Sequence, residues 1–209
     1  NVAAAVRRTG RVFMEAYHYP YHPFARRMRE LLDTRAIGAL QSVEATMTIP
    51  ASVIRADNIR RQFALGGGSV MDAGCYALRA LSDVLGDAER VVEATAELDQ
   101  ADPQVDMEMR ATLAYAGGRS GRIHTSFLAD SKATMNVTVR GAAGLLSADY
   151  LFVPQWGGTL RMEWEGRTYT ERADTTPTYL YQLRELVRCI RDGAPVLTSA
   201  DNGTALMRT

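Results

Sequence analysis

The stretch that decides the fold is MEMRATLAYAGGRSGRIHTSFL, residues 107–128, in which apolar and polar side chains alternate along two short runs. A period of two indicates half-buried β-strands, since successive side chains of a strand point to opposite faces. Gly117-Gly118 lies between the runs and is typical of a hairpin turn. Strands this close in sequence can only pair antiparallel, because a parallel crossover needs a dozen or more residues.

The same pattern extends to both sides of this hairpin, with glycine-rich turns between the runs. We predict strands at 11–17, 43–49, 90–98, 107–115, 121–128, 133–139, 145–152, 158–164 and 167–171. Residues 50–65 lack any period and predict a long loop, which in a compact domain is more often functional than idle.

Amphipathic spacing predicts three longer helices, at 23–33, 69–85 and 178–191. The predicted fold class is therefore α+β: an open, mostly antiparallel β-sheet with these helices on one face. Depending on register, Ile123, Thr125 and Phe127 or their neighbours lie on the uncovered face. An uncovered sheet face with many apolar residues needs a partner, so we expect a homo-oligomer formed through the sheet.

Both ends of the chain have the pattern of an interrupted helix. Residues 1–9 resemble the last turns of a helix, closed by Gly10 just past its end. Ser199 or Asp201 is placed to cap another helix, which reaches Leu206 near the last residue. We therefore expect this chain to be a fragment of a longer protein.

Composition limits the possible partners. The 209 residues hold 24 Lys and Arg against 24 Asp and Glu, a formal net charge of +0, which argues against a nucleic-acid or anionic-membrane partner. No apolar run approaches the roughly 20 residues of a membrane span. Cys75 and Cys189 are too few for a disulfide framework and have no second cysteine at metal-binding spacing. We expect a cytoplasmic protein with two reduced thiols.

The glycine triplet Gly66-Gly67-Gly68 is the first candidate for a binding feature. It follows a loop rather than a strand and lacks the G-x-G-x-x-G spacing of a dinucleotide site, so no cofactor-binding residue is predicted in this chain. Glycines here let the backbone approach something closely. That neighbour is either another element of the protein or a ligand, and the sequence leaves both open.

Asp72 and Tyr76 are the candidates for catalysis, because the i, i+4 spacing places them on one face of the predicted helix. A structural role remains open, since a carboxylate is favoured in the first turn by the helix dipole and a tyrosine can simply pack. A tyrosine acts as general acid or base only when a nearby cation lowers its pKa. The one lysine of the chain, Lys132, lies in the strand region.

Histidines near the first predicted strand are candidates for a site of another kind. Glu15, His18 and His22 have a spacing that could bind a metal on a helix, but Pro20 and Pro23 prevent a regular helix there, so we predict no metal. Strand ends are where sites tend to be built. Tyr17 and His18 therefore remain candidate site residues, alongside a structural role for His18.

Three segments carry a family resemblance. They are Glu15-Ala16-Tyr17-His18-Tyr19-Pro20-Tyr21-His22-Pro23, Leu65-Gly66-Gly67-Gly68-Ser69-Val70-Met71-Asp72-Ala73-Gly74-Cys75-Tyr76, and Tyr181-Gln182-Leu183 through Asp192-Gly193 with Val196-Leu197. Together they resemble the glucose–fructose oxidoreductase/inositol dehydrogenase (Gfo/Idh/MocA) family. A tyrosine at position 76, where many members have histidine, is similar to the glucose–fructose oxidoreductase and dimeric dihydrodiol dehydrogenase branch.

The resemblance implies the second domain of a two-domain enzyme. Residues 1–16 would be the tail of an N-terminal dinucleotide-binding domain and a connecting strand, 17–198 the C-terminal substrate and oligomerisation domain, and 199–209 the start of a truncated helix. NAD or NADP would be bound mainly by the missing Rossmann domain. The family's Glu-Lys-Pro motif, which supplies a catalytic lysine, would lie upstream of Asn1, so this chain alone is expected to be inactive.

The resemblance further implies an NAD(P)-dependent oxidoreductase that moves a hydride between nicotinamide and a secondary alcohol or carbonyl of a sugar, cyclitol or diol. Tyr76 would be the proton donor or acceptor and Asp72 its polar partner. We expect Tyr17, His18, Asn58 and Arg60 to contact the substrate, with loop 50–65 as a lid. The alternative is a non-catalytic dimerisation or interaction domain of the same fold.

Overall fold

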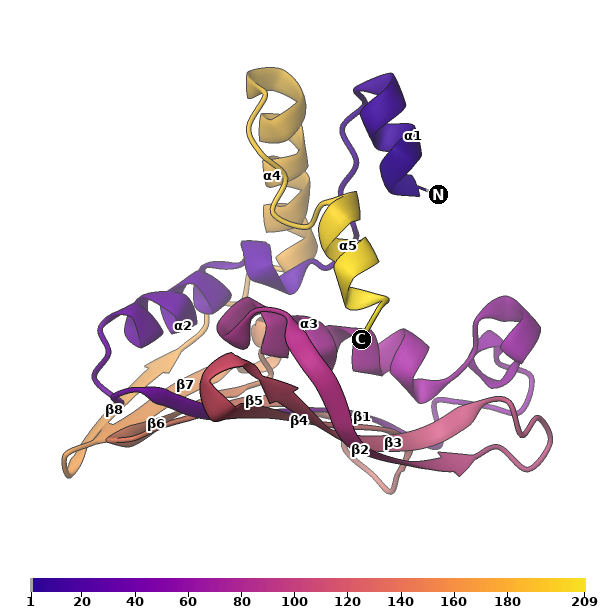
Figure 1. Ribbon diagram of the computed structural model, residues 1–209, viewed down its shortest axis with the longest axis horizontal. Helices are drawn as coiled ribbons and strands as arrows, with labels where there is room; N and C mark the ends of the chain where they lie inside the picture. Colours follow the sequence, from indigo (N-terminus) through magenta and orange to yellow (C-terminus); the bar gives the residue numbers. More distant parts are fainter. Residues whose placement is uncertain (1) are drawn as a thin grey trace.

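The computed structural model describes residues 2–209, so residue 1 of the predicted N-terminal segment lies outside the described residues. It contains an open sheet of eight strands in the order β2-β3-β4-β1-β5-β6-β7-β8, with helices on one side (Figure 1). The strands are β1 (Leu40–Pro50), β2 (Ala88–Leu98), β3 (Asp106–Tyr115), β4 (Arg119–Ala129), β5 (Thr134–Gly141), β6 (Gly144–Asp149), β7 (Thr159–Trp164) and β8 (Arg167–Arg172). The predicted α+β class is confirmed.

One strand pair departs from the antiparallel expectation. β1 and β4 pair in parallel at the centre of the sheet, with Val43 opposite Gly121 and Ala45 opposite Ile123, and the other six neighbouring pairs are antiparallel. The antiparallel expectation holds only for strands that are close in sequence. β1 instead reaches β4 through a helix and the β2–β3 hairpin, a connection long enough to reverse direction.

The helices occupy two different places. They are α1 (Val2–Thr9), α2 (Pro23–Asp33), α3 (Cys75–Leu85), α4 (Thr178–Asp192) and α5 (Ala200–Leu206). α2 and α3 lie along the sheet, whereas α4 and α1 project away from it (Figure 1). The prediction that 178–191 covers the sheet is therefore wrong, although the helix itself exists.

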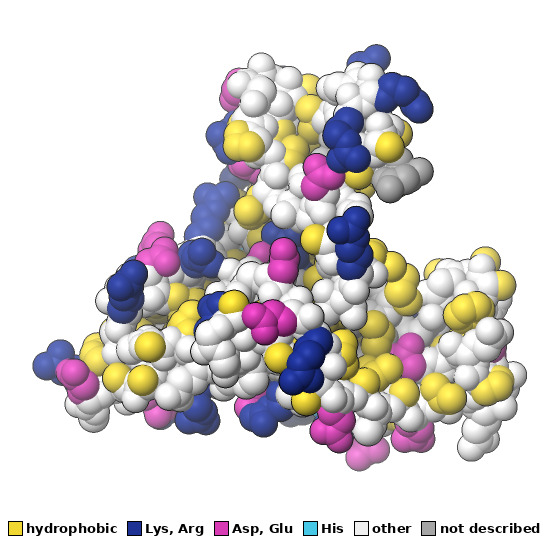
Figure 2. Space-filling model, viewed as in Figure 1, with side chains coloured by type: hydrophobic (Ala, Val, Ile, Leu, Met, Phe, Trp, Pro, Cys, Tyr) yellow, Lys and Arg dark blue, Asp and Glu magenta, His cyan; other side chains and the backbone are white. Residues whose placement is uncertain are grey.

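The projecting helix α4 leaves its apolar stripe uncovered in this chain. Tyr179, Leu183, Val187 and Ile190 recur at helical spacing, and all four are exposed. Hydrophobic side chains are visible on this projecting part in Figure 2. An amphipathic helix with an exposed apolar face normally packs against something.

The two faces of the sheet differ sharply in polarity. Ile123, Thr125 and Phe127 are buried beneath the helices, so of the two registers that the sequence left open, the structure has the one that places their neighbours on the uncovered face. Their neighbours Arg122 and His124 point the other way. The uncovered face has a shallow hollow of about 400 Å³ that is lined mostly by polar residues, namely Glu44, Thr46, Glu93, Thr95, Arg110, Thr112, Arg122 and His124, together with Ala45, Ala111 and Ile123.

Local capping explains where the helices begin and end. His22 caps α2, because its Nδ1 accepts a hydrogen bond from the backbone N–H of Phe24 at 3.1 Å, and Pro23 occupies the first helical position. Ser199 caps α5 in a capping box with Asn202, which confirms one of the two predicted caps. α1 ends at Thr9, and Gly10 donates its N–H to Val6 O at 2.9 Å.

The predicted strand 11–17 does not form. This segment is irregular, and its backbone pairs locally with the C-terminal part of the chain, where Glu15 N donates to Thr198 O at 2.8 Å. Only Tyr17 of this segment is buried, while Arg11, Val12 and Ala16 are exposed, so the segment lacks the alternating burial of a strand. Strand 145–152 is likewise shorter than predicted, because β6 ends at Asp149. Among the described residues, no helix is long and apolar enough to cross a membrane.

Candidate active site

The helix that carries Asp72 and Tyr76 begins with an unusual turn. Val70–Gly74 forms a single π-helical turn, η4, which continues directly into α3. Such wide turns within helices are frequent at functional sites, because the extra residue changes the direction of the side chains that follow. Asp72 lies within the π-turn, and Tyr76 follows in the first turn of α3.

A carboxylate from the sheet holds the start of this helix. Asp106 Oδ2 accepts hydrogen bonds from Ser69 Oγ at 2.6 Å and from the backbone N–H of Val70 at 2.9 Å. Ser69 Oγ also lies 2.8 Å from Thr125 Oγ1 on β4. A negative group at a helix N-terminus satisfies free N–H groups and is favoured by the helix dipole. Asp106 therefore fixes the helix start to β3.

The glycine triplet serves close backbone packing within the protein. A Cβ on Gly67 would lie 2.7 Å from the carbonyl oxygen of Arg60 and 2.8 Å from the backbone of Gln62. Gly68 has a φ of +126°, and a Cβ there would lie 2.4 Å from Asp106 Oδ1. The sequence left open whether the close neighbour of these glycines is a ligand or another element of the protein. In the structure it is another element of the protein.

This packing brings Arg60 to Asp72. Arg60 Nε lies 2.6 Å from Asp72 Oδ2, and both side chains are partly exposed. Asn58 caps the short turn η2 (Ile59–Arg61), because its side-chain oxygen accepts from the backbone N–H of Arg60 at 3.0 Å. The structure thus brings one predicted substrate contact, Arg60, to Asp72, whereas the other, Asn58, contacts the backbone of Arg60, so both already have partners within the chain.

Two further contacts hold the loop that carries Arg60. Arg61 Nε lies 2.5 Å from the buried carboxylate of Asp99. The hydrogen bond from Arg61 is the main reason that the pKa of Asp99 is lowered. The backbone N–H of Phe63 donates to Asp102 Oδ2 at 3.1 Å. The loop predicted over 50–65 exists, but it contains short helical turns and is fastened to the β2–β3 connection.

Aromatic rings surround Tyr76. Its ring centroid lies 5.2 Å from that of Tyr17 in an edge-to-face arrangement, 5.7 Å from both His18 and Phe152, and 6.3 Å from Tyr19. Burial is the main cause that raises the pKa of the Tyr76 phenol above its usual value near 10.0. Within the described residues, the other groups that act on it are Cys75, Tyr179 and Asp72, none of which is a cation. The phenol is therefore protonated at neutral pH.

Tyr17 and His18 differ in what they can offer a ligand. Burial raises the pKa of Tyr17, whose hydroxyl lies beside the Cys75 thiol, and burial also raises the pKa of that thiol to about 11. His18 is 5% exposed, its Nδ1 has no hydrogen-bond partner among the described residues, and burial lowers its pKa to about 4. A neutral imidazole next to Tyr76 can donate or accept a hydrogen bond.

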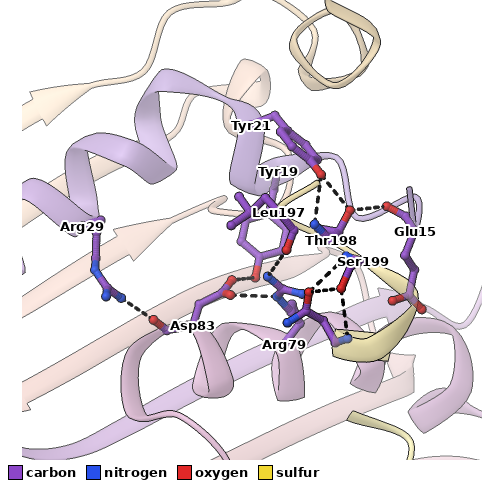
Figure 3. Close-up of polar contacts among 10 residues, drawn as sticks. Glu15, Tyr19, Tyr21, Arg29, Arg79, Asp83, Leu197, Thr198 and Ser199 are labelled. Carbon is purple, nitrogen blue, oxygen red and sulfur yellow. Dashed lines mark hydrogen bonds and ion pairs between the residues drawn. The ribbon is translucent and has the colours of Figure 1, made fainter. Parts of the chain in front are cut away.

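A buried arginine, which the sequence analysis missed, ties the site to the rest of the chain (Figure 3). Arg79 Nε lies 2.7 Å from Asp83 Oδ1, and Arg79 Nη2 donates to Leu197 O at 3.4 Å. Asp83 Oδ2 accepts from the Tyr19 hydroxyl at 2.8 Å. The signal that could have identified it is an arginine on the apolar face of a predicted helix with an aspartate four residues later.

The remaining groups give no competing site. A cavity of about 670 Å³ lies between α2, α3 and α5, lined by Tyr19, Arg79 and Asp83 among others, and neither Asp72 nor Tyr76 lines it. Within residues 2–209 no three His, Cys, Asp or Glu side chains are grouped to hold a metal. His22, considered in the sequence as a ligand, is fully buried as the cap of α2.

The described residues thus form an α+β domain with an open sheet, helices on one face and Asp72 and Tyr76 on a helix whose start is held by the sheet. The family model of the GFO/IDH/MocA C-terminal domain matches residues 25–147. The chain belongs to this family.

Relatives agree with that assignment. The chain is 33% identical over 204 residues to D-xylose 1-dehydrogenase (NADP(+)) 2 of Haloferax volcanii, covering 96% of the chain and 60% of the relative. It is 30% identical to a dTDP-3,4-didehydro-2,6-dideoxy-alpha-D-glucose 3-reductase of Actinomadura kijaniata, over 72% of the chain and 44% of the relative. The chain thus spans about 60% or less of these relatives.

Solved structures share the fold. The aldose-aldose oxidoreductase of Caulobacter crescentus, complexed with glycerol, superposes with a TM-score of 0.86 at 23% identity, over 98% of this chain and 61% of that one. The 3-ketoreductase KijD10 of Actinomadura kijaniata, in complex with NADP and TDP-benzene, superposes with a TM-score of 0.81 at 22% identity. The match covers 98% of this chain and 61% of KijD10.

Neither the glycine-rich turn nor the parallel strand pair of the described residues has the form of a dinucleotide-binding site. Gly67 and Gly68 are filled by the protein's own backbone and by Asp106, so they leave no cradle for a phosphate. The parallel pair β1 and β4 is connected through β2 and β3 and not by a single helix, so it is not the βαβ unit of a nucleotide fold.

Acidification should destabilise the protein through His18. Its pKa is about 4 in the folded chain against 6.5 in the absence of burial, so the unfolded chain binds the proton first. Its contribution to stability is complete above about pH 6.5 and is lost as the pH falls toward 4. We expect a loss on the order of 2 kcal/mol from this residue.

Urea unfolding of the wild type and of His18→Asn at several values between pH 7.5 and pH 4 measures this effect. Burial also lowers the pKa of His22, but His22 titrates in both proteins. The difference between their unfolding free energies at each pH therefore reports on His18 alone. Curves that stay parallel over the whole range would contradict the assignment.

Proposed function

We propose that this chain is the substrate domain of an NADP-dependent oxidoreductase that acts on a secondary alcohol or carbonyl of a sugar or related polyol. The observation that carries the proposal is the placement of Tyr76, a protonated phenol, one helical turn from the Asp72–Arg60 pair. The names of the relatives, a NADP-dependent xylose dehydrogenase and sugar 3-reductases, support the same chemistry.

Tyr76 would move the proton in this reaction. When a carbonyl is reduced, negative charge develops on its oxygen, and a positioned acid neutralises it. Bound NADP would supply the hydride chemistry. When an alcohol is oxidised, Tyr76 must accept the proton as a phenolate. Burial raises the pKa of Tyr76 and so disfavours the phenolate, which therefore needs a nearby cation to stabilise it. We assign that cation to the lysine of the Glu-Lys-Pro motif expected in the partner domain.

Asp72 would act as the polar partner of Tyr76, with its charge balanced by Arg60. An unpaired carboxylate one turn from the phenol would oppose phenolate formation, because like charges disfavour each other. The 2.6 Å contact with Arg60 offsets that effect. This is a positioning role, and it differs from the direct substrate contact first expected of Arg60.

The substrate would be held by neutral groups. His18 offers an unpartnered Nδ1 for a hydrogen bond to a hydroxyl group of the substrate. Tyr17 would shape the site through its ring, while Asn58 would fix the turn that presents Arg60. The anchored loop 50–65 would form a wall of the site rather than a freely moving lid.

The exposed stripe on α4 supports a second domain. We propose the division first expected from the sequence, with 1–16 leading from a dinucleotide-binding domain, 17–198 as the substrate domain and 199–209 as the start of a further helix. The stripe residues Leu183, Val187 and Ile190 would pack on that domain. A cytoplasmic location remains a prediction.

The enzyme proposal predicts a large effect of Tyr76→Phe in the full-length protein. The change removes the hydroxyl and keeps the ring, so the aromatic packing and the melting temperature should be preserved. We expect kcat to fall roughly 100- to 10,000-fold, with little change in NADP affinity. Asp72→Asn should lower kcat less, because it keeps the size and hydrogen bonding of the side chain. Near-normal turnover by a correctly folded Tyr76→Phe variant would exclude the proton-donor role.

The two-domain proposal predicts that the 209-residue chain alone binds NADPH weakly or not at all and is inactive. The reason is that its glycine-rich turn is filled by the protein itself. Titration of the chain with NADPH, followed by the cofactor's fluorescence, measures the affinity. A micromolar dissociation constant for this chain would refute the assignment of the cofactor to another domain.

A second proposed function is an interaction domain that forms homo-oligomers through the uncovered sheet face. That face is polar, and the Arg122–Glu44 ion pair lies at its hollow. We therefore propose an oligomer held by polar contacts rather than by the apolar contacts first expected. Such an oligomer is compatible with catalysis. The interaction function would replace the enzymatic one only if the full-length protein lacks activity.

Because charged contacts are screened by salt, the oligomer should weaken between low salt and about 1 M NaCl, where the Debye length is roughly 3 Å. Light scattering at tens of micromolar, an order-of-magnitude choice for a moderate dissociation constant, reports the mass. Arg122→Glu should favour the monomer, and Arg55→Glu on the exposed loop is the matched control. A monomer already at low salt would contradict the proposal.

A further inference from the structure

An exposed aromatic ring lies beside the site and has no part in the proton transfer described above. Tyr179 is the second residue of α4 and is 61% exposed. Its ring centroid lies 4.3 Å from that of His18, with 46° between the planes. His18 in turn packs against Tyr76 at 5.7 Å, so Tyr179 continues the aromatic cluster outward from the reactive phenol.

The other rings of this cluster are less accessible to a ligand. Tyr17, Tyr19 and Phe152 are buried, and Tyr76 itself is half-buried. Tyr179 therefore presents the largest open ring surface next to the reactive group. A tyrosine provides rigid, amphipathic contact area, apolar on its face and polar at its hydroxyl, at little cost in conformational entropy.

Three arginines of this region are already paired with carboxylates, and burial raises the pKa of Glu15, a carboxyl group that acts on Tyr17 and has no hydrogen-bond partner for its Oε2 among the described residues. Arg60 pairs with Asp72, Arg61 with Asp99, and Arg79 with Asp83, at 2.6, 2.5 and 2.7 Å. The groups left for a ligand are the imidazole of His18, the phenol of Tyr76 and the ring of Tyr179. This combination suits a neutral molecule that has hydroxyl groups around its edge and an apolar C–H face.

We propose that Tyr179, backed by His18, is the stacking platform for the ring of the substrate, so that the protein selects neutral cyclic polyols over open-chain ones. The assignment rests on the proposed oxidoreductase function and adds a substrate class and a specificity-determining residue to it. The hydroxyl to be oxidised would face Tyr76 while the C–H face of the ring lies on Tyr179.

The alternative role for Tyr179 is a contact between domains, because it begins the apolar stripe of α4. Leu183 lies one turn further along the same stripe and is exposed to a similar extent, 57%. It lies outside the aromatic cluster formed by Tyr76, His18 and Tyr179. Leu183→Ala is therefore the matched control for the loss of apolar contact on α4.

The test uses the full-length protein with NADP and two matched five-carbon polyols, D-xylose as the ring form and xylitol as the open chain. We expect Tyr179→Ala to raise KM for D-xylose about 2- to 12-fold, the range of an aromatic face contact, with kcat within about twofold. KM for xylitol should stay unchanged. Tyr179→Phe should retain wild-type KM for D-xylose, and Leu183→Ala should leave the ratio of the two KM values unchanged.

The outcomes separate the platform from the function on which it rests. Equal changes in KM for both polyols, or the same pattern from Leu183→Ala, would overturn the platform while the oxidoreductase stands. A wild-type protein that oxidises neither these nor other polyols with NADP would overturn the proposed function and the platform with it. A selective loss for D-xylose in Tyr179→Ala alone would support both.

Discussion

The carboxylate of Asp106 at the start of the η4–α3 helix is the interaction on which the candidate site depends. It accepts hydrogen bonds from Ser69 and from the backbone of Val70, and it leaves no space for a side chain at position 68. Because Asp106 is the first residue of β3, the helix start is tied to the sheet. Asp72 and Tyr76 are then placed by the π-turn and by the face of the helix that follows.

The loop that carries Arg60 depends on the same fixed start. Its backbone packs on Gly67 at a distance that no other residue would allow, and this contact brings the guanidinium of Arg60 to Asp72. Arg79, which follows Tyr76 by three residues on α3, connects this helix to the C-terminal segment at Leu197. The site is thus assembled from segments far apart in sequence, by charged groups that are largely paired within the chain.

Short-range pattern predicted most of the elements. The hairpins, α2 and the cap at Ser199 follow from alternation, helical spacing and turn residues, which are local properties. The segment 11–17 and the place of α4 were wrong, because a period of two or an amphipathic face does not tell which surface a segment packs against. The parallel pairing of β1 with β4 depends on the path of the chain between them.

The candidate site was predictable only in part for the same reason. Asp72 and Tyr76 share a helix face, so their spacing indicated a pair, whereas no periodicity links Arg60 to Asp72 or Ser69 to Asp106. Seven of the eight strands of the sheet lie between Tyr76 and Tyr179 in sequence, and the contact of Tyr179 with His18 arises only in the folded chain.

The most direct test of the account is a crystal structure of the full-length protein with NADP and a bound cyclic polyol. The account predicts that the Tyr76 hydroxyl lies within hydrogen-bond distance, about 2.6–3.2 Å, of the oxygen on the carbon that faces the nicotinamide. A polyol bound against the nicotinamide with its reacting oxygen on another side chain, and with Tyr76 out of reach, would contradict it.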